Sequence, residues 1–189
     1  MKTPTLVELS SLIVNCHKCP LSESRSHPVV GGGNINSKIM IVGEGPGAHE
    51  DLSGEAFIGP AGQLLDKMMK YAGIDRNNAF LTNVVKCFPP ENRTPRPAEV
   101  KTCLDYLRMQ YLLQHPRLII CLGAVASKAM INPDFSIMRL HGQIQEKKGI
   151  LFVPTFHPAA LLRDPDKKPL AYEDWKTIKK VIEEKGLAR

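Results

Sequence analysis

Hydrophobic residues occur along this chain in short runs, which are separated by segments rich in glycine, proline and charged residues. An unbroken run of about five apolar residues is typical of a strand buried on both faces, whereas apolar residues three or four positions apart are typical of a helix. The pattern predicts strands over 38–42, 79–85, 117–122, 144–145 and 150–154, and helices over 4–15, 62–72, 97–114, 123–130, 159–163 and 170–185. Because strands and helices alternate, we expect an α/β fold of three layers, with a mostly parallel central sheet and helices on both faces.

Some details of these elements depend on single residues. Thr3 is expected to cap the first helix, with Pro4 at an early helical position. Met68 and Met69 lie on the apolar side of the second helix and are expected to fill the core. Residues 88–97 contain four prolines and are therefore predicted to form a loop.

Composition narrows the class of protein. The 189 residues are 43% hydrophobic, and no repeat or linker divides them, so we expect a single domain over residues 1–189. No apolar run reaches the roughly 18 residues of a membrane span, and the cysteines are too few and too unevenly spaced for a secreted disulfide scaffold. We therefore expect a soluble, intracellular protein. The net charge of +6 is compatible with a polyanionic partner, although many basic proteins bind no nucleic acid.

A glycine-rich segment from Gly43 to Asp51 follows the first predicted strand. Its three glycines within five residues allow the backbone to turn sharply and to approach a ligand closely. The segment also supplies Glu44 and Glu50, and Phe57 follows it. Acidic groups and an aromatic ring beside bare backbone, at the carboxyl end of a strand, are typical of pockets in open α/β sheets. The alternative is an ordinary turn with solvated acids.

Two further polar residues are expected at the same edge of the sheet. Asn83 lies near the end of an apolar strand, where a polar amide is uncommon and calls for a structural or functional explanation. A lone histidine is usually structural, but His157 ends another apolar strand just before a helix begins. Because the carboxyl ends of parallel strands meet at one edge, we expect both residues to lie beside the 43–51 segment.

The cysteines suggest a metal centre. Cys16 and Cys19 form a tight pair with two residues between them, whereas Cys87 and Cys103 come from a strand end and a helix. Zinc usually favours two tight pairs, so this arrangement suits a bulkier iron–sulfur cluster. The alternative is that the cysteines stay reduced and never meet. Cys121 lies within an apolar strand and is interpreted as a small buried hydrophobic residue.

Basic side chains are also expected near this edge. If they shared one location they would form a phosphate-binding rim, and otherwise each is an ordinary solvated residue. The candidates are Lys86, Arg93, Arg96, Arg139, His141 and Arg163.

Together these motifs resemble those of the family 4 uracil-DNA glycosylases, the iron–sulfur type of prokaryotes. The resemblance runs from Cys16 to about Arg163. It rests on Cys16-x-x-Cys19, Gly43-Glu44-Gly45-Pro46-Gly47 with Glu50-Asp51, Phe57-Ile58-Gly59 with Ala61-Gly62, Thr82-Asn83-Val84-Val85-Lys86-Cys87, Asn92-Arg93-Thr94-Pro95, Cys103, and Pro154-Thr155-Phe156-His157-Pro158 with Leu161-Leu162-Arg163.

The resemblance implies a uracil-DNA glycosylase-like fold and an enzyme of DNA repair. Such an enzyme flips uracil out of DNA, hydrolyses its N-glycosidic bond and leaves an abasic site, which initiates base excision repair. Three residues are implied in catalysis, namely His157, Glu44 and Asn83. Uracil binding is assigned to Gly43, Glu44, Gly45, Glu50, Phe57, Asn83 and His157, and DNA binding to Arg93 and Arg163.

In this reading Asn83 accepts from uracil N3–H and donates to O4, whereas cytosine offers the opposite pattern. By resemblance Phe57 stacks on the base and Glu50 occupies the space of a thymine methyl group. His157 donates to O2, and Glu44 orients the attacking water.

The same resemblance implies a 4Fe–4S cluster held by Cys16, Cys19, Cys87 and Cys103. It implies uracil-containing DNA, single-stranded or double-stranded, as substrate. We expect a monomer in the cytoplasm of a prokaryote, associated with the nucleoid, and a sliding-clamp partner is left open. The competing hypothesis is a non-catalytic iron–sulfur DNA-binding module, which would explain the charge and the cysteines but not a converging amide, aromatic ring and histidine.

Overall fold

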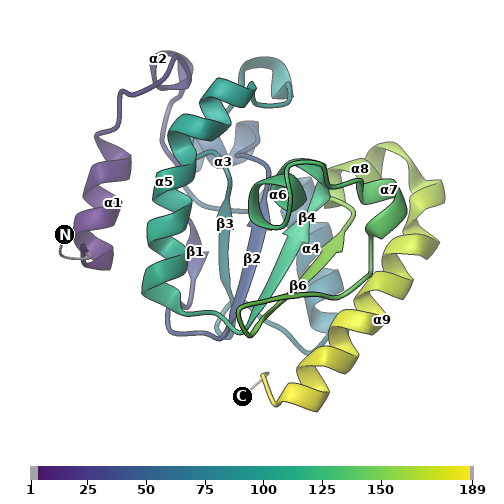
Figure 1. Ribbon diagram of the computed structural model, residues 1–189. Coiled ribbons are helices and arrows are strands. Elements are labelled where there is room, and N and C mark those ends of the chain that lie inside the picture. The colour runs from purple at the N-terminus through teal and green to yellow at the C-terminus, as the bar shows by residue number, and fades with distance from the viewer. Residues whose placement is uncertain (1–3, 188–189) are drawn as a thin grey trace.

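Six strands form one sheet in the computed structural model, which describes residues 4–187. The strand order is β1-β3-β2-β4-β6-β5 (Figure 1). The strands are β1 (Gly32–Gly33), β2 (Ile39–Gly43), β3 (Phe80–Asn83), β4 (Leu118–Leu122), β5 (Gln145–Lys147) and β6 (Ile150–Thr155).

Helices surround this sheet. They are α1 (Leu6–Val14), α2 (Leu21–Ser24), α3 (Ala48–Ser53), α4 (Pro60–Tyr71), α5 (Pro97–Gln114), α6 (Gly123–Met130), α7 (Ile137–Leu140), α8 (Pro158–Arg163) and α9 (Lys168–Lys185), with 3₁₀ turns at Pro90–Asn92 and Pro165–Lys167.

The four central strands, β3, β2, β4 and β6, pair in parallel, and the short strands β1 and β5 pair antiparallel at the two borders. The predicted three-layer α/β fold with a mostly parallel sheet is therefore confirmed. Strand β4 is central, because an all-apolar strand is stable only where both of its faces are covered.

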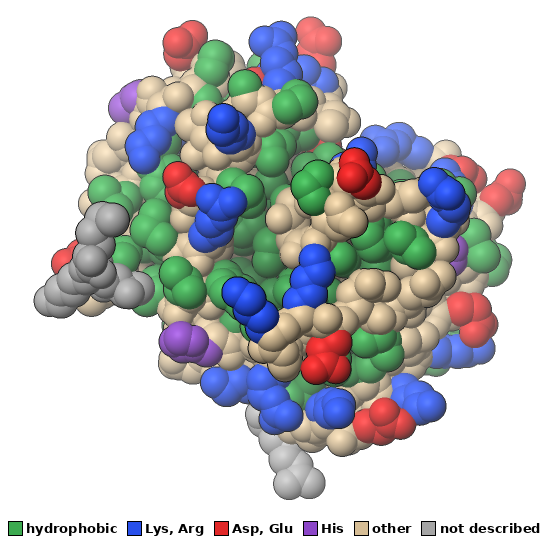
Figure 2. Space-filling view, in the orientation of Figure 1, with side chains coloured by type: hydrophobic (Ala, Val, Ile, Leu, Met, Phe, Trp, Pro, Cys, Tyr) green, Lys and Arg blue, Asp and Glu red, His purple; other side chains and the backbone are tan. Residues whose placement is uncertain are grey.

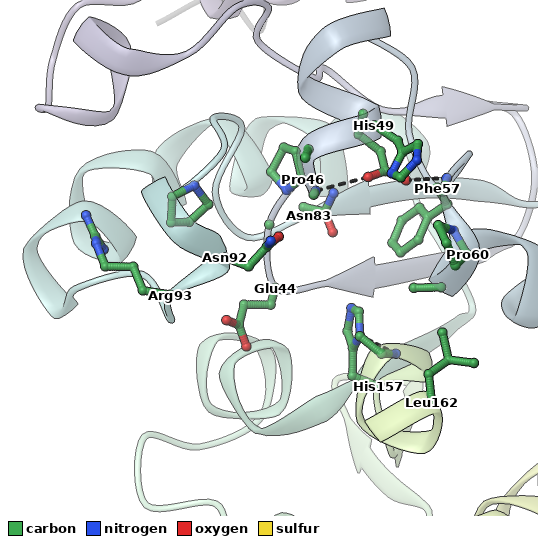
Figure 3. A pocket seen from close by; sticks show the side chains of 18 of the residues that line it. Glu44, Pro46, His49, Phe57, Pro60, Asn83, Asn92, Arg93, His157 and Leu162 are labelled. Atoms are coloured by element: carbon green, nitrogen blue, oxygen red, sulfur yellow. Dashed lines mark hydrogen bonds between the residues drawn. The ribbon is translucent and has the colours of Figure 1, made fainter. Parts of the chain in front are cut away.

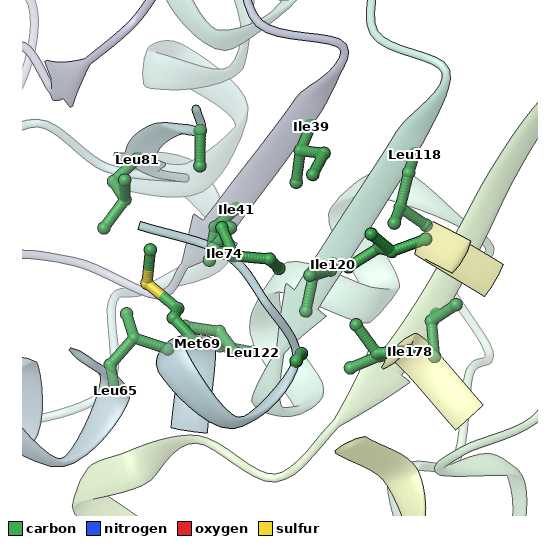
Figure 4. Packing of buried hydrophobic residues seen from close by; sticks show 14 of the residues in the cluster. Ile39, Ile41, Leu65, Met69, Ile74, Leu81, Leu118, Ile120, Leu122 and Ile178 are labelled. Atoms are coloured by element: carbon green, nitrogen blue, oxygen red, sulfur yellow. The ribbon is translucent and has the colours of Figure 1, made fainter. Parts of the chain in front are cut away.

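Alternate residues of the central strands point to opposite faces of the sheet, as the period of two in a strand requires. On one face, Ile39 and Ile41 of β2 pack with Leu65 of α4 and with Trp175 and Ile178 of α9. Figure 4 shows this cluster closing around Ile41, Ile120 and Met69. Met69 is buried there, as predicted.

The other face of the sheet is covered by α1, α5 and α6 (Figure 1). Met40 and Val42 of β2 pack with Leu9 of α1 and Leu107 of α5. Cys121 is fully buried in this layer and behaves as the small hydrophobic residue that the sequence predicted.

The structure corrects two of the predicted element boundaries. Residues 43–51 are not all loop, because α3 begins at Ala48, and the Glu50 carboxylate accepts from Gly47 N–H at 3.1 Å to close its first turn. Helix α1 begins at Leu6, not at Pro4, because Thr5 and Glu8 cap it reciprocally. Thr3, the predicted cap, lies outside the described residues.

The order in which strands are added to the sheet reverses its direction at β2. From β2 the chain passes to β3 on one side of it, and then to β4 on the other side. In an open α/β sheet a crevice forms outside the carboxyl ends of the strands at such a reversal. The carboxyl ends of β2, β3 and β6 thereby place Gly43, Asn83 and His157 at one edge of the sheet.

The surface carries mixed charge. Figure 2 shows lysine and arginine side chains spread among acidic ones over the face that it displays, without a single basic field. Among residues 4–187, no helix is long and apolar enough to cross a membrane.

Candidate active site

A pocket of about 480 Å³ opens at the carboxyl edge of the sheet. It brings together most of the residues that the sequence assigned to substrate and DNA. Those that line it are Glu44, Gly45, Glu50, Phe57, Asn83, Arg93, His157 and Arg163. Figure 3 shows Asn83 and His157 pointing into the same space from opposite sides, with Phe57 beside them.

Gly43 lies against the inner end of this space. A Cβ atom there would overlap the Asn83 side-chain oxygen and would lie 2.8 Å from the Phe57 ring. Glycine is therefore required at this position for the pocket to exist in its observed shape. Asp51, in contrast, lies away from the pocket, where its carboxylate accepts from Ser26 N–H at 2.9 and 3.1 Å.

Asn83 is the last residue of β3 and is almost completely buried. Its side-chain oxygen Oδ1 is buried and has no hydrogen-bond partner among the described residues. An unpaired buried acceptor costs stability, on the order of 1–3 kcal/mol. Such an acceptor beside a pocket is a position where a ligand donor would be satisfied.

His157 caps helix α8, and its ring has a defined polarity. Nδ1 accepts from Ala159 N–H at 3.2 Å, so in the neutral ring the proton is on Nε2. Nε2 is buried and has no partner among residues 4–187. Burial lowers the pKa of His157 to about 4, with the Arg163 charge acting in the same direction and Glu50 opposing it. The imidazole is thus neutral at pH 7 and presents an N–H donor to the pocket.

Phe57 holds its ring in place through an uncommon backbone conformation. Its φ of 56° is in the left-handed region, which a bulky residue rarely adopts. The Arg76 guanidinium donates to the carbonyl of Phe57 and, at 3.1 Å, to that of Ala56. Any Cβ at Gly62 would overlap the Phe57 carbonyl. These contacts fix the ring at the pocket wall, and no local sequence pattern indicates the role of Arg76.

Glu50 joins the two loops that form the pocket. One carboxylate oxygen accepts from Gly47 N–H, and the other accepts from Ile58 N–H at 2.9 Å and Gly59 N–H at 2.8 Å. The side chain lines the pocket but is already held by three backbone donors. Its observed contacts therefore brace the segment that carries Phe57.

Glu44 stands at the pocket wall and is partly buried. Burial raises the pKa of Glu44, while the nearby Arg163 charge and a hydrogen bond with Thr94 oppose the rise. A carboxylate in these surroundings is a stronger base than a solvated one. In Figure 3 Glu44 and His157 lie on the same side of the pocket, opposite Asn83.

Of the six basic residues considered for a phosphate-binding rim, two line the pocket. Arg93 and Arg163 line the pocket, and Arg93 is held by a bidentate ion pair with the buried Glu99, at 2.7 and 2.8 Å. Lys86 does not belong to the rim, because it is only 1% exposed. His141 instead pairs with Asp174 at 2.8 Å.

Asn92 and Leu162 are among the pocket-lining residues that were given no role in the sequence analysis. Asn92 lies in the proline-rich loop with a φ of 54°. A polar amide between prolines is the sequence feature that could have indicated its place in the pocket. Leu162 lines the pocket while 46% exposed. The sequence feature that could have indicated Leu162 is its position as an apolar residue next to Arg163, in the short helix that follows His157.

The four predicted cysteine ligands meet in a second, small pocket. This pocket is lined by Cys16, Cys19, Cys87 and Cys103. The alternative in which the four cysteines never meet is therefore wrong. No three potential ligands within residues 4–187 form a site for a single metal ion.

Hydrogen-bond donors surround these sulfur atoms. Arg25 donates to Cys87 Sγ at 3.0 Å and also to the carbonyl of Cys16 at 2.8 Å. The backbone N–H of Lys86 donates to Cys103 Sγ at 3.3 Å. Donors of this kind suit sulfur atoms that carry negative charge, as thiolate ligands do. Burial raises the pKa of Cys103 to about 11, so a thiolate there needs a positive partner such as a metal.

Comparison of the sequence with those of known proteins agrees with the fold and the pocket. A family model described as the uracil DNA glycosylase superfamily matches residues 30–179, and the chain belongs to this superfamily. It is 43% identical to a Type-4 uracil-DNA glycosylase of Pyrobaculum aerophilum over 85% of this chain and 86% of that protein. It is 38% identical to a Type-4 uracil-DNA glycosylase of Thermotoga maritima, over 94% and 95%. The protein therefore belongs to the type-4 uracil-DNA glycosylases, a family of DNA glycosylases, and the resemblance noted from the sequence is confirmed.

A solved structure supports the fold. The crystal structure of WT Pedobacter heparinus SMUG2 superposes with a TM-score of 0.50 at 15% sequence identity. It covers 80% of this chain and 77% of that chain.

Proposed function

We propose that this protein flips uracil out of DNA into the pocket and hydrolyses its N-glycosidic bond, leaving an abasic site for base excision repair. One observation carries the proposal. A buried unpaired acceptor, Asn83 Oδ1, and a buried unpaired donor, His157 Nε2, border the same pocket beside Phe57. Uracil offers the complementary groups, an N3–H donor flanked by carbonyl oxygens.

Asn83 would select uracil over cytosine. Its Oδ1 accepts from N3–H and its amide N–H donates to O4, whereas cytosine has an acceptor at N3 and a donor at N4. A cytosine in the pocket would leave both pairs mismatched. Each correct edge contact of this kind is worth about 1–3 kcal/mol.

His157 would stabilise the leaving base. Negative charge develops on uracil O2 as the bond to the sugar breaks, and a preorganised N–H donor lowers the energy of that state. The neutral ring is suited to this role because the low pKa leaves the proton on Nε2 throughout the neutral range. No proton needs to be transferred before the base departs.

Glu44 is proposed to orient the attacking water and to stabilise the cationic sugar. The support is its place in the pocket and its raised pKa, which makes it a better acceptor for a water proton. The Gly43–Gly45 backbone is proposed to contact the uracil oxygens, and Phe57 is proposed to stack on the uracil ring. Glu50 is proposed to fill the space of a thymine methyl group, in addition to bracing the loops.

The DNA would approach along the rim of the pocket. Arg93 and Arg163 are proposed to contact phosphates flanking the flipped nucleotide. Leu162 is an exposed apolar residue at the same rim, and it is proposed to fill the gap that the flipped base leaves in a duplex. Both single-stranded and double-stranded DNA are proposed substrates.

The cysteine pocket is proposed to hold a 4Fe–4S cluster through Cys16, Cys19, Cys87 and Cys103. The fit rests on four sulfur atoms around one pocket and on the N–H groups that donate to two of them. A cluster there would supply a structural link and not an electron, because hydrolysis of a glycosidic bond needs no redox step.

Release of uracil from DNA tests the proposal. Wild-type protein, incubated with single-stranded DNA and with duplex DNA containing a U·G mismatch, should release free uracil and leave alkali-labile sites. Tight DNA binding without any uracil release would instead support the non-catalytic iron–sulfur DNA-binding module.

A further inference from the structure

Lys86 is a fully buried lysine that the proposed reaction does not use. It is 1% exposed, and burying an ammonium group is costly unless its donors are satisfied. Its Nζ donates to three acceptors, namely Thr82 Oγ1 at 2.7 Å, the Asn83 carbonyl at 2.6 Å and Gln110 Oε1 at 2.7 Å. The side chain therefore turns back along its own segment towards the pocket.

The Asn83 carbonyl is the point where this network reaches the pocket. The peptide that follows Asn83 is already held, because Val84 N–H donates to the Gly43 carbonyl at 2.9 Å and Val85 N–H donates to the Glu44 carbonyl at 3.1 Å. The Lys86 ammonium group then holds the Asn83 carbonyl itself. Both polar groups of the peptide that joins Asn83 to Val84, its carbonyl and its N–H, are thus held.

The other end of Lys86 reaches the cysteine pocket. Its backbone N–H donates to Cys103 Sγ at 3.3 Å, and its neighbour in sequence is Cys87. Gln110 belongs to the same helix as Cys103, α5, and also donates to the Val30 carbonyl at 2.6 Å. Lys86 therefore links α5 and the cysteine pocket to the end of β3, next to a direct hydrogen bond in which Thr82 Oγ1 of β3 donates to Gln110 Oε1 of α5 at 2.9 Å.

We propose that Lys86 is a positioning residue that holds Asn83 in the orientation needed to read the base, anchored from the side of the cysteine pocket. This inference rests on the proposed function, because it concerns the same amide. Displacing a substrate-contacting group by about 1 Å can cost on the order of a hundredfold in rate. The role needs no change in the charge of Lys86 during the reaction.

Lys86→Met tests this inference, because methionine has a similar length and lacks the three donors. Lys101→Met, at an exposed lysine of α5, is the matched control. For each protein we would measure the single-turnover rate of uracil release at saturating DNA, the Kd for abasic-site DNA, the melting temperature and the visible absorption. Rates are compared at a temperature where all proteins are folded.

Lys86→Met should lose roughly tenfold or more in single-turnover rate, while its Kd and its visible absorption per molecule stay near those of the wild type. Lys101→Met should match the wild type in all four. An unchanged rate would overturn the inference and leave Lys86 as a packing residue. A rate loss that only parallels a loss of visible absorption would also overturn it, because Lys86 would then act through the cysteine pocket alone.

Gln110→Leu keeps the inference testable if Lys86→Met does not fold. It removes one acceptor of the ammonium group and lines neither the pocket nor the cysteine site. A several-fold lower single-turnover rate is expected, and a wild-type rate would overturn the inference. If the wild type itself releases no uracil, the proposed function fails, and that outcome is distinct from any result with these variants.

Discussion

At the scale of single residues, the Asn83 amide is the group proposed to read the base, and Asn83→Asp keeps its size while removing its donor. An ionised carboxylate would repel uracil O4, so uracil excision should fall steeply. The same carboxylate accepts from cytosine N4–H and, if burial keeps it protonated, also donates to N3. Weak cytosine excision should therefore appear, mainly from mismatched or single-stranded DNA, where flipping costs least.

The measurement is single-turnover release of uracil and cytosine from otherwise identical strands. The ratio of the two rates should shift by roughly tenfold or more, given 1–3 kcal/mol for an edge contact. Uracil release at nearly the wild-type rate would mean that Asn83 does not read the base.

His157→Ala should fold, bind uracil-containing DNA and lose about a hundredfold or more in single-turnover cleavage, the scale of removing one oxyanion donor. The physical reason is the loss of the buried Nε2–H donor. Pre-steady-state cleavage at saturating enzyme separates the chemical step from binding. Weakened binding with an unchanged cleavage rate would reassign His157 to a positioning role.

The pKa of His157 also predicts how stability depends on pH. Burial lowers this pKa from 6.5 to about 4, so between these values the unfolded chain binds a proton that the folded protein does not. The free energy of unfolding should therefore fall as the pH falls through this window, and the penalty is complete below the folded-state pKa.

His157→Asn removes this titration while retaining an oxygen that can cap α8. Its stability relative to the wild type should rise as the pH is lowered, as measured by denaturant unfolding between about pH 7 and 4.5. His115→Asn is the control, because His115 is exposed and has a φ of 51° that asparagine tolerates. A constant difference between wild type and His157→Asn would show that His157 titrates normally.

At the scale of elements, the cysteine pocket links α1, the segment after β3 and α5. Cys87→Ala removes one of the four proposed ligands, whereas Cys121→Ala removes a buried sulfur of β4 that does not line the cysteine pocket. The first variant should lose the brown colour and broad visible absorption of an iron–sulfur protein and should melt at a lower temperature. The second should keep the colour. Elemental analysis that finds stoichiometric zinc without iron would contradict the cluster.

Elements could be predicted from the sequence where local signals agree. Helix α5 has the predicted bounds, because Pro97 begins it and Gln114 precedes a break at His115. Helix α3 was missed, because its start depends on a contact between Gly47 and Glu50 inside a glycine-rich segment that reads as a loop.

Within the candidate site, the sequence predicted residues at strand ends but not their supports. Asn83 and His157 were found because polar residues end apolar strands. Arg76 and Lys86 act through backbone carbonyls and acceptors that the folded chain brings together. No local pattern distinguishes such residues from ordinary surface cations, and for this reason Lys86 was interpreted as a surface residue although it is buried.

At the scale of the whole molecule, the net charge of +6 is not gathered in one field on the face in Figure 2. The arginine and lysine residues that line the pocket are Arg93 and Arg163, so we expect DNA binding to depend on these few cations. Arg163→Gln should reduce the slope of log Kd against log salt concentration by about one, as expected for one phosphate contact. Arg108→Gln, an exposed residue of α5 outside the pocket, should leave the slope unchanged. Equal slopes for all three proteins would remove Arg163 from the DNA interface.

The borders of the sheet also affect how copies of the protein meet one another. An open strand edge presents unpaired N–H and C=O groups onto which a neighbouring chain can add. Here β1 consists of Gly32 and Gly33 alone, and β5 spans three residues that include Glu146 and Lys147. Neither border offers a long apolar template, so crowded copies of this protein are expected to resist edge-to-edge aggregation even at high concentration.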